Sequence, residues 1–478
     1  MGVTRRRFMH WAAAAAAVGR QAPARAAAAF RATLLPSEQA IWDQQVWMAK
    51  LGPKYTGNAA HTRFVDFLAT EFRKIGLDVE RVRYTLPRWD ATRHELRVGG
   101  GTVPITSYFP YSGQTSAAGV SAPLVFAGTN PAFDLGAVNG KIALVECPTN
   151  VRRWAEEYQT WDVYPASERF PASMRPARAS VSDLTPFAKA GAVGVVLAWT
   201  DISDANAADQ YSPFSRPPQG IPALYVGRDT GSRLKSMAAS GATATLVLEA
   251  DVTPDVPTDT IVATLAGASA DEVIILNTHT DGPNATEENG ALGILALMQY
   301  FSRIPRAERR RTIVCPLTTG HFAGPWVPSI RGFIQKYPDT IRKAVAAITI
   351  EHLGCLEWMD DAAMRYRATG KEEWAVAITP SKSMADALAA ALPGTAARRT
   401  AVVNPVKGGF LGEGSALSRA GVPTIGFIPQ PNYLLAGPAD GCIDKLNPRL
   451  MHAQIEVFAR TVHRIDAMTA EQLKRATS

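Results

Sequence analysis

The sequence predicts an α/β fold with helices on both faces of a sheet and a separate β-rich segment inserted into it. Between residues 253 and 478, short apolar runs typical of strands alternate with helical segments. Residues 111–252 differ, because they hold short β-rich runs with frequent glycine and proline. The length of 478 residues exceeds what one ordinary core organises, so two or three domains are expected.

The first expected element is a helical region, residues 35–78. In its second half, large apolar residues recur at intervals of three and four, the spacing of one buried helix face. These residues are Phe64, Phe67, Leu68, Phe72 and Ile75. Gly76 follows them, at a position where glycine commonly ends a helix.

The second expected unit is residues 111–252, called the insert below. Three runs follow one another in it, GKIALVEC (140–147), AKAGAVGVVLAW (188–199) and IPALYVGRDTGSRLKSMAASG (221–241). Their order resembles the protease-associated domain, a β-rich module that is inserted in several peptidases. Because short apolar runs are ambiguous, an unrelated strand-rich insert is the alternative.

The third region supplies the strands at whose ends a site is expected. Strands are predicted at residues 273–277, 312–318, 345–350 and 422–428, and helices at residues 290–301, 329–336 and 383–392. In open α/β sheets, ligands bind at the carboxyl ends of the strands. The segments that follow the four strands are THTDGPNATEENG, TGHFAG, EHLG and PQPNYLLAGPADGC, and they contain His279, His321 and His352.

Nitrogen and oxygen donors of the kind that zinc accepts lie in these segments. We expect five of them to converge at one edge of the sheet: His279, Asp281, Glu288, His321 and Glu351. A histidine that follows a strand can also pack against its neighbours or bridge to solvent. The spacing therefore leaves both a metal site and an ordinary polar site open.

The motifs and their order resemble the co-catalytic zinc exopeptidases, the group of bacterial leucyl aminopeptidases and glutamate carboxypeptidase. The resemblance spans nearly the whole chain after residue 28. It implies a mixed-sheet, zinc-exopeptidase-like domain flanked by helices and built from residues 29–110 and 253–478. The insert would then be a protease-associated domain.

The resemblance also implies roles for particular residues. His279 in HTD corresponds to a metal ligand, and Asp281 to the carboxylate that orients its imidazole. Glu288 in TEENGALG stands where the family has the aspartate that bridges two metals. Glu351 in ITIEHLG stands at the aspartate that binds the same metal as His279. Each of these two carboxylates is one methylene longer than the family's aspartate.

The other half of the family's site is substituted. Gly320 stands at the glutamate that acts as general base, His321 at the glutamate that binds the second metal, and Ala436 at the last histidine ligand. One zinc ion is therefore expected rather than two, and a site without zinc is the alternative. His321 is either a ligand or a hydrogen-bonded residue of a filled cleft. Four residues are candidates to replace the base: Asp281, Glu287, His321 and Glu413.

Two functions follow from this pattern. The first is an exported, metallopeptidase-like hydrolase that acts on a peptide or a related amide with one metal ion and a changed base. The second is a catalytically inactive pseudo-peptidase, retained to bind a ligand or a protein. A serine nucleophile is not supported, because GEGSALS (412–418) lacks the flanking glycines of a nucleophile elbow.

The N-terminus, TRRRFMHWAAAAAAVGRQAPARAAAA, resembles a twin-arginine export signal and predicts a periplasmic or extracellular protein. Residues 1–28 hold five arginines and no acid, so without them the formal charge falls from +7 to +2. No nucleic-acid partner is therefore expected, and no membrane-spanning helix follows the signal. The sequence does not predict an oligomeric state. Three disulfide pairings are open to the four cysteines, Cys147, Cys315, Cys355 and Cys442.

Overall fold

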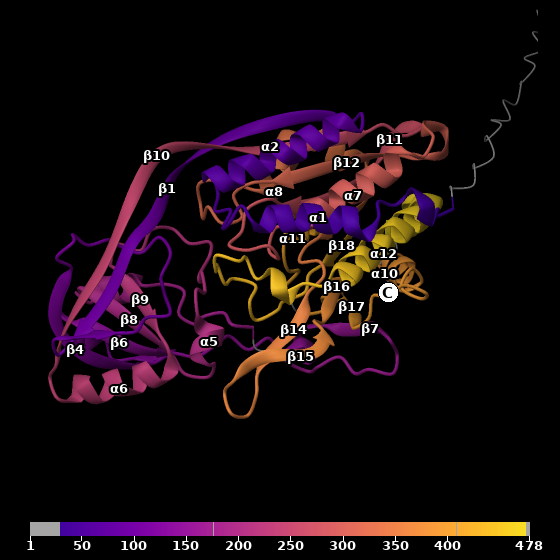
Figure 1. Cartoon of the computed structure of the whole chain (residues 1–478). Helices are drawn as coiled ribbons and strands as arrows, with labels where there is room; N and C mark the ends of the chain where they lie inside the picture. Colours follow the sequence, from indigo (N-terminus) through magenta and orange to yellow (C-terminus); the bar gives the residue numbers. More distant parts are fainter. Residues whose placement is uncertain (1–28, 175, 408, 475–478) are drawn as a thin grey trace, which may run out of the picture.

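The computed structural model describes residues 29–174, 176–407 and 409–474, and the predicted export signal lies outside them. Figure 1 shows two parts that are joined by a long two-stranded ribbon. Its strands, β1 (Asp78–Val98) and β10 (Thr243–Leu265), pair antiparallel along nearly their whole length. Most of the insert lies between these strands in the sequence, and its end, residues 243–252, belongs to β10, so the ribbon leads the chain out to the smaller part and back.

The larger part contains the middle of a mixed sheet of sixteen strands. Strand β11 pairs parallel with β12 and β13, and β13 pairs parallel with β18, whereas β10 and β16 are antiparallel to β12 and β18. The four predicted strands are confirmed, and so is the mixed α/β fold. The order after β10 is β12 (Arg311–Thr318), β11 (Ser269–His279), β13 (Ala344–Ile350), β18 (Thr424–Phe427), β16 (Ala375–Ile378) and β17 (Thr400–Asn404).

Helices cover both faces of this sheet, as predicted. Alternate residues of β11 face opposite cores, because Ile274 belongs to one apolar cluster and Ile275 to another. The first cluster is covered by α1 (Glu38–Ala49), α2 (Ala59–Lys74), α7 (Gly290–Ser302), α10 (Lys382–Ala389), α12 (Pro448–Ala467) and α13 (Ala470–Lys474). The second is covered by α8 (Ile330–Lys336), α9 (Pro338–Lys343) and α11 (Gly414–Arg419).

Side-chain caps and apolar spacing account for the first two helices. The side chains of Ser37 and Asn58 accept hydrogen bonds from backbone amides in the first turns of α1 and α2. Phe64, Leu68 and Phe72 of α2 are fully buried, as their spacing predicted. These two helices therefore fix the loop between them, residues 50–58, against the sheet.

Beyond β10, the sheet continues through five shorter strands, of which four lie in the insert and the outermost, residues 107–108, lies just before it. They are β4 (Val120–Thr129), β6 (Ile142–Cys147), β8 (Gly194–Trp199), β9 (Ala223–Val226) and β3 (Ser107–Tyr108). Helices α4 (Thr185–Lys189) and α6 (Arg228–Ala239) pack on their two faces. The assignment of the insert to the protease-associated domain stays a prediction.

One segment of the insert returns to the larger part. Strand β7 (Gln159–Tyr164) pairs antiparallel with β17 at the far edge of the main sheet. Around it, Tyr158 donates a hydrogen bond to the carbonyl of Gly409, 2.5 Å away. The insert therefore contacts the larger part through this segment as well as through the ribbon.

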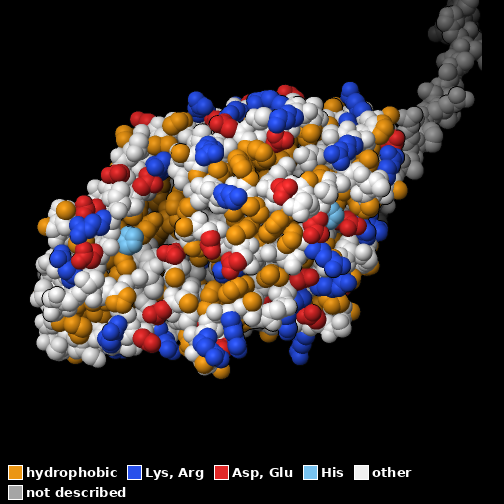
Figure 2. All heavy atoms as spheres, viewed as in Figure 1, with side chains coloured by type: hydrophobic (Ala, Val, Ile, Leu, Met, Phe, Trp, Pro, Cys, Tyr) orange, Lys and Arg blue, Asp and Glu red, His pale blue; other side chains and the backbone are white. Residues whose placement is uncertain are grey.

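The remaining elements are short and peripheral. They are β2 (Gly101–Val103), β5 (Ala132–Phe133), α3 (Trp154–Glu157), α5 (Asp204–Ala207) and the separate pair β14 (Leu356–Asp360) and β15 (Tyr366–Glu372). All four cysteines are buried and unpaired. None of the described helices combines the length and the apolar character that crossing a membrane requires. Figure 2 shows basic and acidic side chains intermingled over both parts on the face in view.

Candidate metal centre

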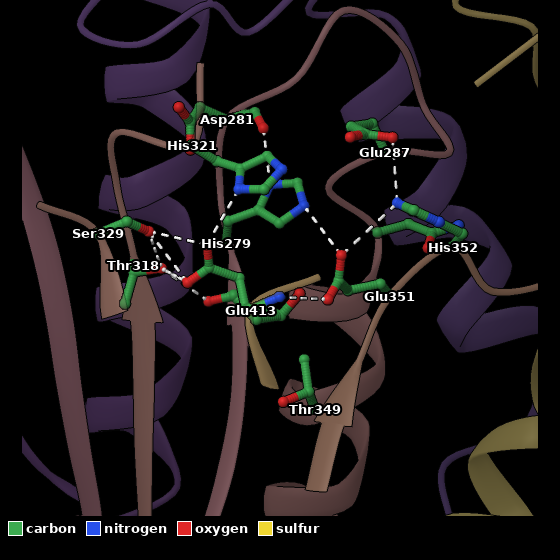
Figure 3. A network of polar contacts seen from close by, with 12 residues as sticks. His279, Asp281, Glu287, Thr318, His321, Ser329, Thr349, Glu351, His352 and Glu413 are labelled. Carbon is green, nitrogen blue, oxygen red and sulfur yellow. Dashed lines mark hydrogen bonds and ion pairs between the residues drawn. The ribbon is translucent and has the colours of Figure 1, made fainter. Parts of the chain in front are cut away.

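Polar side chains gather where β11, β12 and β13 end, the edge of the sheet that the sequence predicted. His279 is the last residue of β11, His321 lies three residues beyond β12, and Glu351 directly follows β13. His352 and Glu287 complete the group. We call these five residues the histidine cluster, and Figure 3 shows them from close by.

Each imidazole of the histidine cluster has an oxygen acceptor at its Nδ1 atom. These oxygens accept a hydrogen bond from a protonated Nδ1, which leaves the lone pair of Nε2 free. Metal-binding histidines are oriented in the same way by an acceptor at their other ring nitrogen. The three pairs are His279 with the carbonyl of Asp281 (2.8 Å), His321 with Oε1 of Glu413 (3.0 Å) and His352 with the carbonyl of Pro429 (2.6 Å).

Several ligating atoms of the cluster are buried and lack a hydrogen-bond partner among the described residues. They include Nε2 of His279, Nε2 of His352 and Oε2 of Glu287. Nε2 of His352 lies 3.0 Å from Oε2 of Glu287, within the distance of an ion pair. Oε2 of Glu351 lies 3.7 Å from Nε2 of His279. Buried polar atoms left in this state are costly, and a cation among them would satisfy them all.

Two triads in the cluster have ligating atoms that all lie within 4.8 Å of one another. One is His279, Glu351 and His352, which are all buried. The other is His279, Glu287 and His321. Three nitrogen or oxygen ligands are what a catalytic zinc site takes from its protein, so the residues present fit this metal.

The carboxylates dominate the electrostatics of the cluster. Burial disfavours a charged His279, but Glu351, Glu287 and Asp281 outweigh burial and raise its pKa to about 10. Burial likewise disfavours a charged Glu287, but His352 and His279 outweigh it and lower its pKa to about 2. The cluster therefore favours ionised carboxylates with positive charge between them, which protons or a metal ion can supply.

Glu288, the expected bridging ligand, lies outside both triads. Its Oε1 atom is 2.6 Å from Nζ of Lys54, and both side chains are fully buried. Lys54 also donates to the carbonyl of Gly52, 2.7 Å away. Burial lowers the pKa of Lys54 to about 7. The neighbouring Glu287 points into the cluster in its place.

Asp281 orients His279 through its backbone rather than through its carboxylate. The carbonyl of Asp281 is the acceptor at Nδ1 of His279. Its carboxylate accepts instead from Thr56, 2.5 Å away, from the amide of Phe322, 2.9 Å away, and from the amide of Gly320, 3.2 Å away. The carboxylate therefore fixes the turn after β12 that carries His321.

Glu413 is fully occupied as an acceptor. Its carboxylate accepts from Nδ1 of His321, from Thr318 and from Ser329, each at 3.0 Å. Burial opposes its charge, but the contact with His321 outweighs burial and lowers the pKa of Glu413 to about 2. Glu413 therefore positions His321, and it has no oxygen free for a water molecule.

Gly320 and Ala436 stand where the resemblance to the zinc exopeptidases implies a general base and a histidine ligand, and both positions are closely packed. Gly320 has φ of +94°, and a Cβ atom there would lie 2.4 Å from Cβ and Cγ1 of Val327. A glutamate side chain does not fit at this position. Ala436 is buried beside Tyr433, and its carbonyl accepts from the side chain of Asn284.

His352 is the one residue of the histidine cluster for which the sequence pattern predicted no role. Its φ of +58° is in the left-handed region, which a non-glycine residue adopts at some cost in free energy. This backbone turns His352 toward the cluster directly after Glu351. Asn289 holds the next residue, because its side chain both accepts from the amide of Leu353 (2.7 Å) and donates to its carbonyl (2.8 Å). The only signal for His352 was its place in EHLG at a strand end.

The fold is similar to those of solved zinc aminopeptidases. A peptidase M28 precursor from Shewanella amazonensis gives a TM-score of 0.64 at 17% identity, over 91% of this chain and 98% of that one. BSAP, a zinc aminopeptidase from Bacillus subtilis, gives 0.63 at 16% identity, over 90% and 96%. The aminopeptidase from Aneurinibacillus sp. strain AM-1 gives 0.60 at 16%, over 89% and 93%. No protein-family model and no curated protein sequence matches the chain. The similarity thus shows the zinc exopeptidase fold.

Proposed function

We propose that the protein is a metal-dependent hydrolase of peptides or related amides that works with one ion, zinc in the first place. The observation that carries this proposal is the common orientation of three imidazoles, each anchored at Nδ1, with two carboxylates beside their Nε2 atoms.

His279, His352 and Glu351 are the residues that hold the ion in this proposal, because they form the fully buried triad. His321 lies next to it, with its ring stacked on that of His279 at a centroid distance of 4.1 Å. Zinc at such a site polarises a carbonyl and acidifies bound water.

Glu287 is the residue proposed to accept the proton from water, at its Oε2 atom. That atom lies 3.0 Å from Nε2 of His352, at the side of the cluster where the ion is proposed to bind. Asp281 accepts three hydrogen bonds at Oδ2 and lies outside both triads, Glu413 accepts from three side chains, and Glu288 is paired with Lys54. Of the acids considered from the sequence, Glu287 alone therefore belongs to one of the two triads without being among the residues proposed to hold the ion.

The proposal is tested with purified protein loaded with zinc and a mixture of short peptides, with mass spectrometry to detect release of terminal residues. We expect cleavage by the wild type, loss of both metal and cleavage in His279→Ala, and retained metal with a fall in kcat of about 10²- to 10⁴-fold in Glu287→Gln. Glu156→Gln, an exposed acid of the insert, is the matched control. Metal binding without any cleavage would support the second function, a pseudo-peptidase.

Export is part of the same proposal. The Arg5-Arg6-Arg7 start of the sequence supports a twin-arginine signal. We expect Arg5→Lys combined with Arg6→Lys to hold the precursor in the cytoplasm. Export of that double variant at the normal rate would count against the twin-arginine route.

A further inference from the structure

One segment of the insert, residues 203–214, lies against the larger part of the molecule, and we call it the docking segment. It contains α5, which Figure 1 shows between the strands of the insert and the pair β14–β15. Asp360, at the end of β14, accepts hydrogen bonds from the amide of Ser203 (3.0 Å) and from the side chain of Asn206 (2.9 Å). The start of the docking segment is therefore tied to the larger part.

The middle of the docking segment pairs with the larger part through its backbone. Gln210 and Ala436 form an antiparallel bridge. Two hydrogen bonds flank this bridge, from the amide of Tyr211 to the carbonyl of Leu435 (2.8 Å) and from the amide of Gly437 to the carbonyl of Asp209 (3.0 Å). The side chain of Asn284 links the bridge to the histidine cluster, because it donates to the carbonyl of Ala436 (2.7 Å) and accepts from the amide of Glu287 (3.1 Å).

Two aromatic side chains extend the contact. The ring of Phe214 stacks on that of His321 at a centroid distance of 5.1 Å and an angle of 25°, and it lies 4.9 Å from that of Phe322. Tyr211 stacks on Tyr55, in the loop between α1 and α2, at a centroid distance of 4.3 Å. The docking segment thus contacts several separate segments of the larger part, one of which carries His321.

The ligating atoms of the histidine cluster are covered in this arrangement. Nε2 of His279, Nε2 of His352 and Oε2 of Glu287 are fully buried. The side chain of His321 is 18% exposed, and it is the cluster residue on which Phe214 stacks. A substrate carbonyl has to come into contact with an ion held by these atoms. It therefore reaches the ion only when residues that cover the cluster move, and the docking segment is the cover on the side of His321.

The docking segment is also held by the smaller part. The amide of Asp209 donates to the carbonyl of Thr106 (2.9 Å), and Ser107 donates to the carbonyl of Gln210 (3.0 Å). The segment therefore moves together with the strands of the smaller part, which the ribbon of β1 and β10 carries. The ladder of this ribbon contains two register shifts, between Leu86 and Arg88 and between Ala91 and Arg93. Such irregularities interrupt the ladder and bend the strands, so they give the ribbon places to flex.

We propose that the docking segment is a lid, which closes the histidine cluster and admits a substrate when the contacts of Gln210 and Phe214 with the larger part open. What enters rests on the proposed function, whereas the opening itself does not require catalysis. Closure of such a segment excludes water and strengthens the electrostatic interactions inside a site. Opening breaks the two backbone hydrogen bonds that flank the bridge, and it leaves the pairing of β11 with β12 and β13 intact.

Hydrogen exchange on the full chain without metal tests the opening. The amides of Tyr211 and Gly437 are the reporters, because both donate across the contact. We expect them to exchange at least about 100-fold faster than the amides of β11, which open only with global unfolding. The amide of Asp209, which donates to Thr106 within the smaller part, is the matched control and is expected to exchange more slowly than the reporters. Reporters as well protected as the amides of β11 would overturn the lid.

A disulfide across the bridge tests the consequence of closure. Both hydrogen bonds flank residues 210 and 436, so these form a non-hydrogen-bonded pair, whose Cα atoms lie about 4.5 Å apart, within the range of a disulfide. The variant is Gln210→Cys with Ala436→Cys. We expect its oxidised form to cleave peptides and to release zinc to a chelator at least about tenfold more slowly than its reduced form. Ser121→Cys with Thr245→Cys is the matched control, because these hydroxyls lie 2.7 Å apart between β4 and β10 of the smaller part.

The two experiments separate the lid from the proposed function. All four native cysteines are buried, so a reductant acts on the engineered bond. If the protein neither binds zinc nor cleaves a peptide, the exchange rates decide alone, and oxidation of the locked variant is expected to slow exchange at Tyr211 and Gly437. An oxidised variant that matches its reduced form in cleavage, zinc release and exchange would overturn the inference.

Discussion

The Nζ atom of Lys54 and the Oε1 atom of Glu288 lie 2.6 Å apart in a region where neither side chain is exposed. Lys54 is in the loop between α1 and α2, and Glu288 is in the turn before α7. The backbone of Lys54 also exchanges two hydrogen bonds with that of Gly282, at 2.8 and 3.0 Å. The N-terminal helices therefore hold the turn that presents Glu287 to the histidine cluster.

Removal of one member of this ion pair leaves the other as an uncompensated buried charge. We expect Lys54→Met to lower the free energy of unfolding by about 3–5 kcal/mol, measured by urea denaturation. Adding Glu288→Leu to that variant is expected to recover most of the loss, because no charge then remains. A cost below about 1 kcal/mol for Lys54→Met, the range of exposed ion pairs, would show that the pair is not buried in solution.

His352 is expected to contribute directly to metal affinity. Asparagine tolerates the left-handed backbone of residue 352, so His352→Asn removes the imidazole with little added strain. We expect zinc affinity to fall by at least about tenfold in competition with a chelator. His94→Asn, on β1, is the matched control and is expected to leave the affinity unchanged. Equal affinities in the two variants would remove His352 from the ligand set.

Gly320 is expected to be required by the backbone. Gly320→Ala combines a backbone of φ +94° with a Cβ atom 2.4 Å from Val327, and we expect it to lower the free energy of unfolding by at least about 1–3 kcal/mol. Gly421→Ala is the matched control, because Gly421 has φ of +83° but open space around it. Denaturation curves that show the same cost at both positions would contradict the argument from Val327.

Stability is expected to depend on pH through Glu373. Burial raises the pKa of this glutamate to about 8, from 4.5. Because the folded-state pKa is the higher one, the unfolded chain binds fewer protons between these values, and the free energy of unfolding falls as the pH rises from about 4.5 to about 8. We expect Glu373→Gln to make the stability at pH 5 and pH 8 more alike, as measured by denaturation at both. A wild type that becomes more stable over this interval, with the same rise in Glu373→Gln, would exclude this role.

The architecture and the edge that holds the site followed from simple patterns in the sequence. Strand β11 and helix α7 were predicted within a few residues because apolar runs of their length and spacing leave little choice. His279 and His321 were placed at one edge because the carboxyl ends of parallel strands meet there.

The choice among neighbouring residues did not follow from the sequence. Glu287 and Glu288 are adjacent in one turn, and the one that enters the cluster is decided by Lys54, a residue far earlier in the chain. Glu351 and His352 both reach the cluster because residue 352 adopts φ of +58°, which no periodic pattern reports. These assignments depend on tertiary contacts and on backbone conformation beyond the end of a strand, where strand alternation no longer applies.

The central claim, that the histidine cluster binds one metal ion, is tested most directly by metal stoichiometry. The protein is purified with zinc present, dialysed and analysed by mass spectrometry beside His279→Ala, with circular dichroism to verify that both are folded. We predict about one zinc per chain in the wild type and none in the variant. A folded wild type without bound metal would contradict the account and would leave the histidine cluster as a remnant of a lost site.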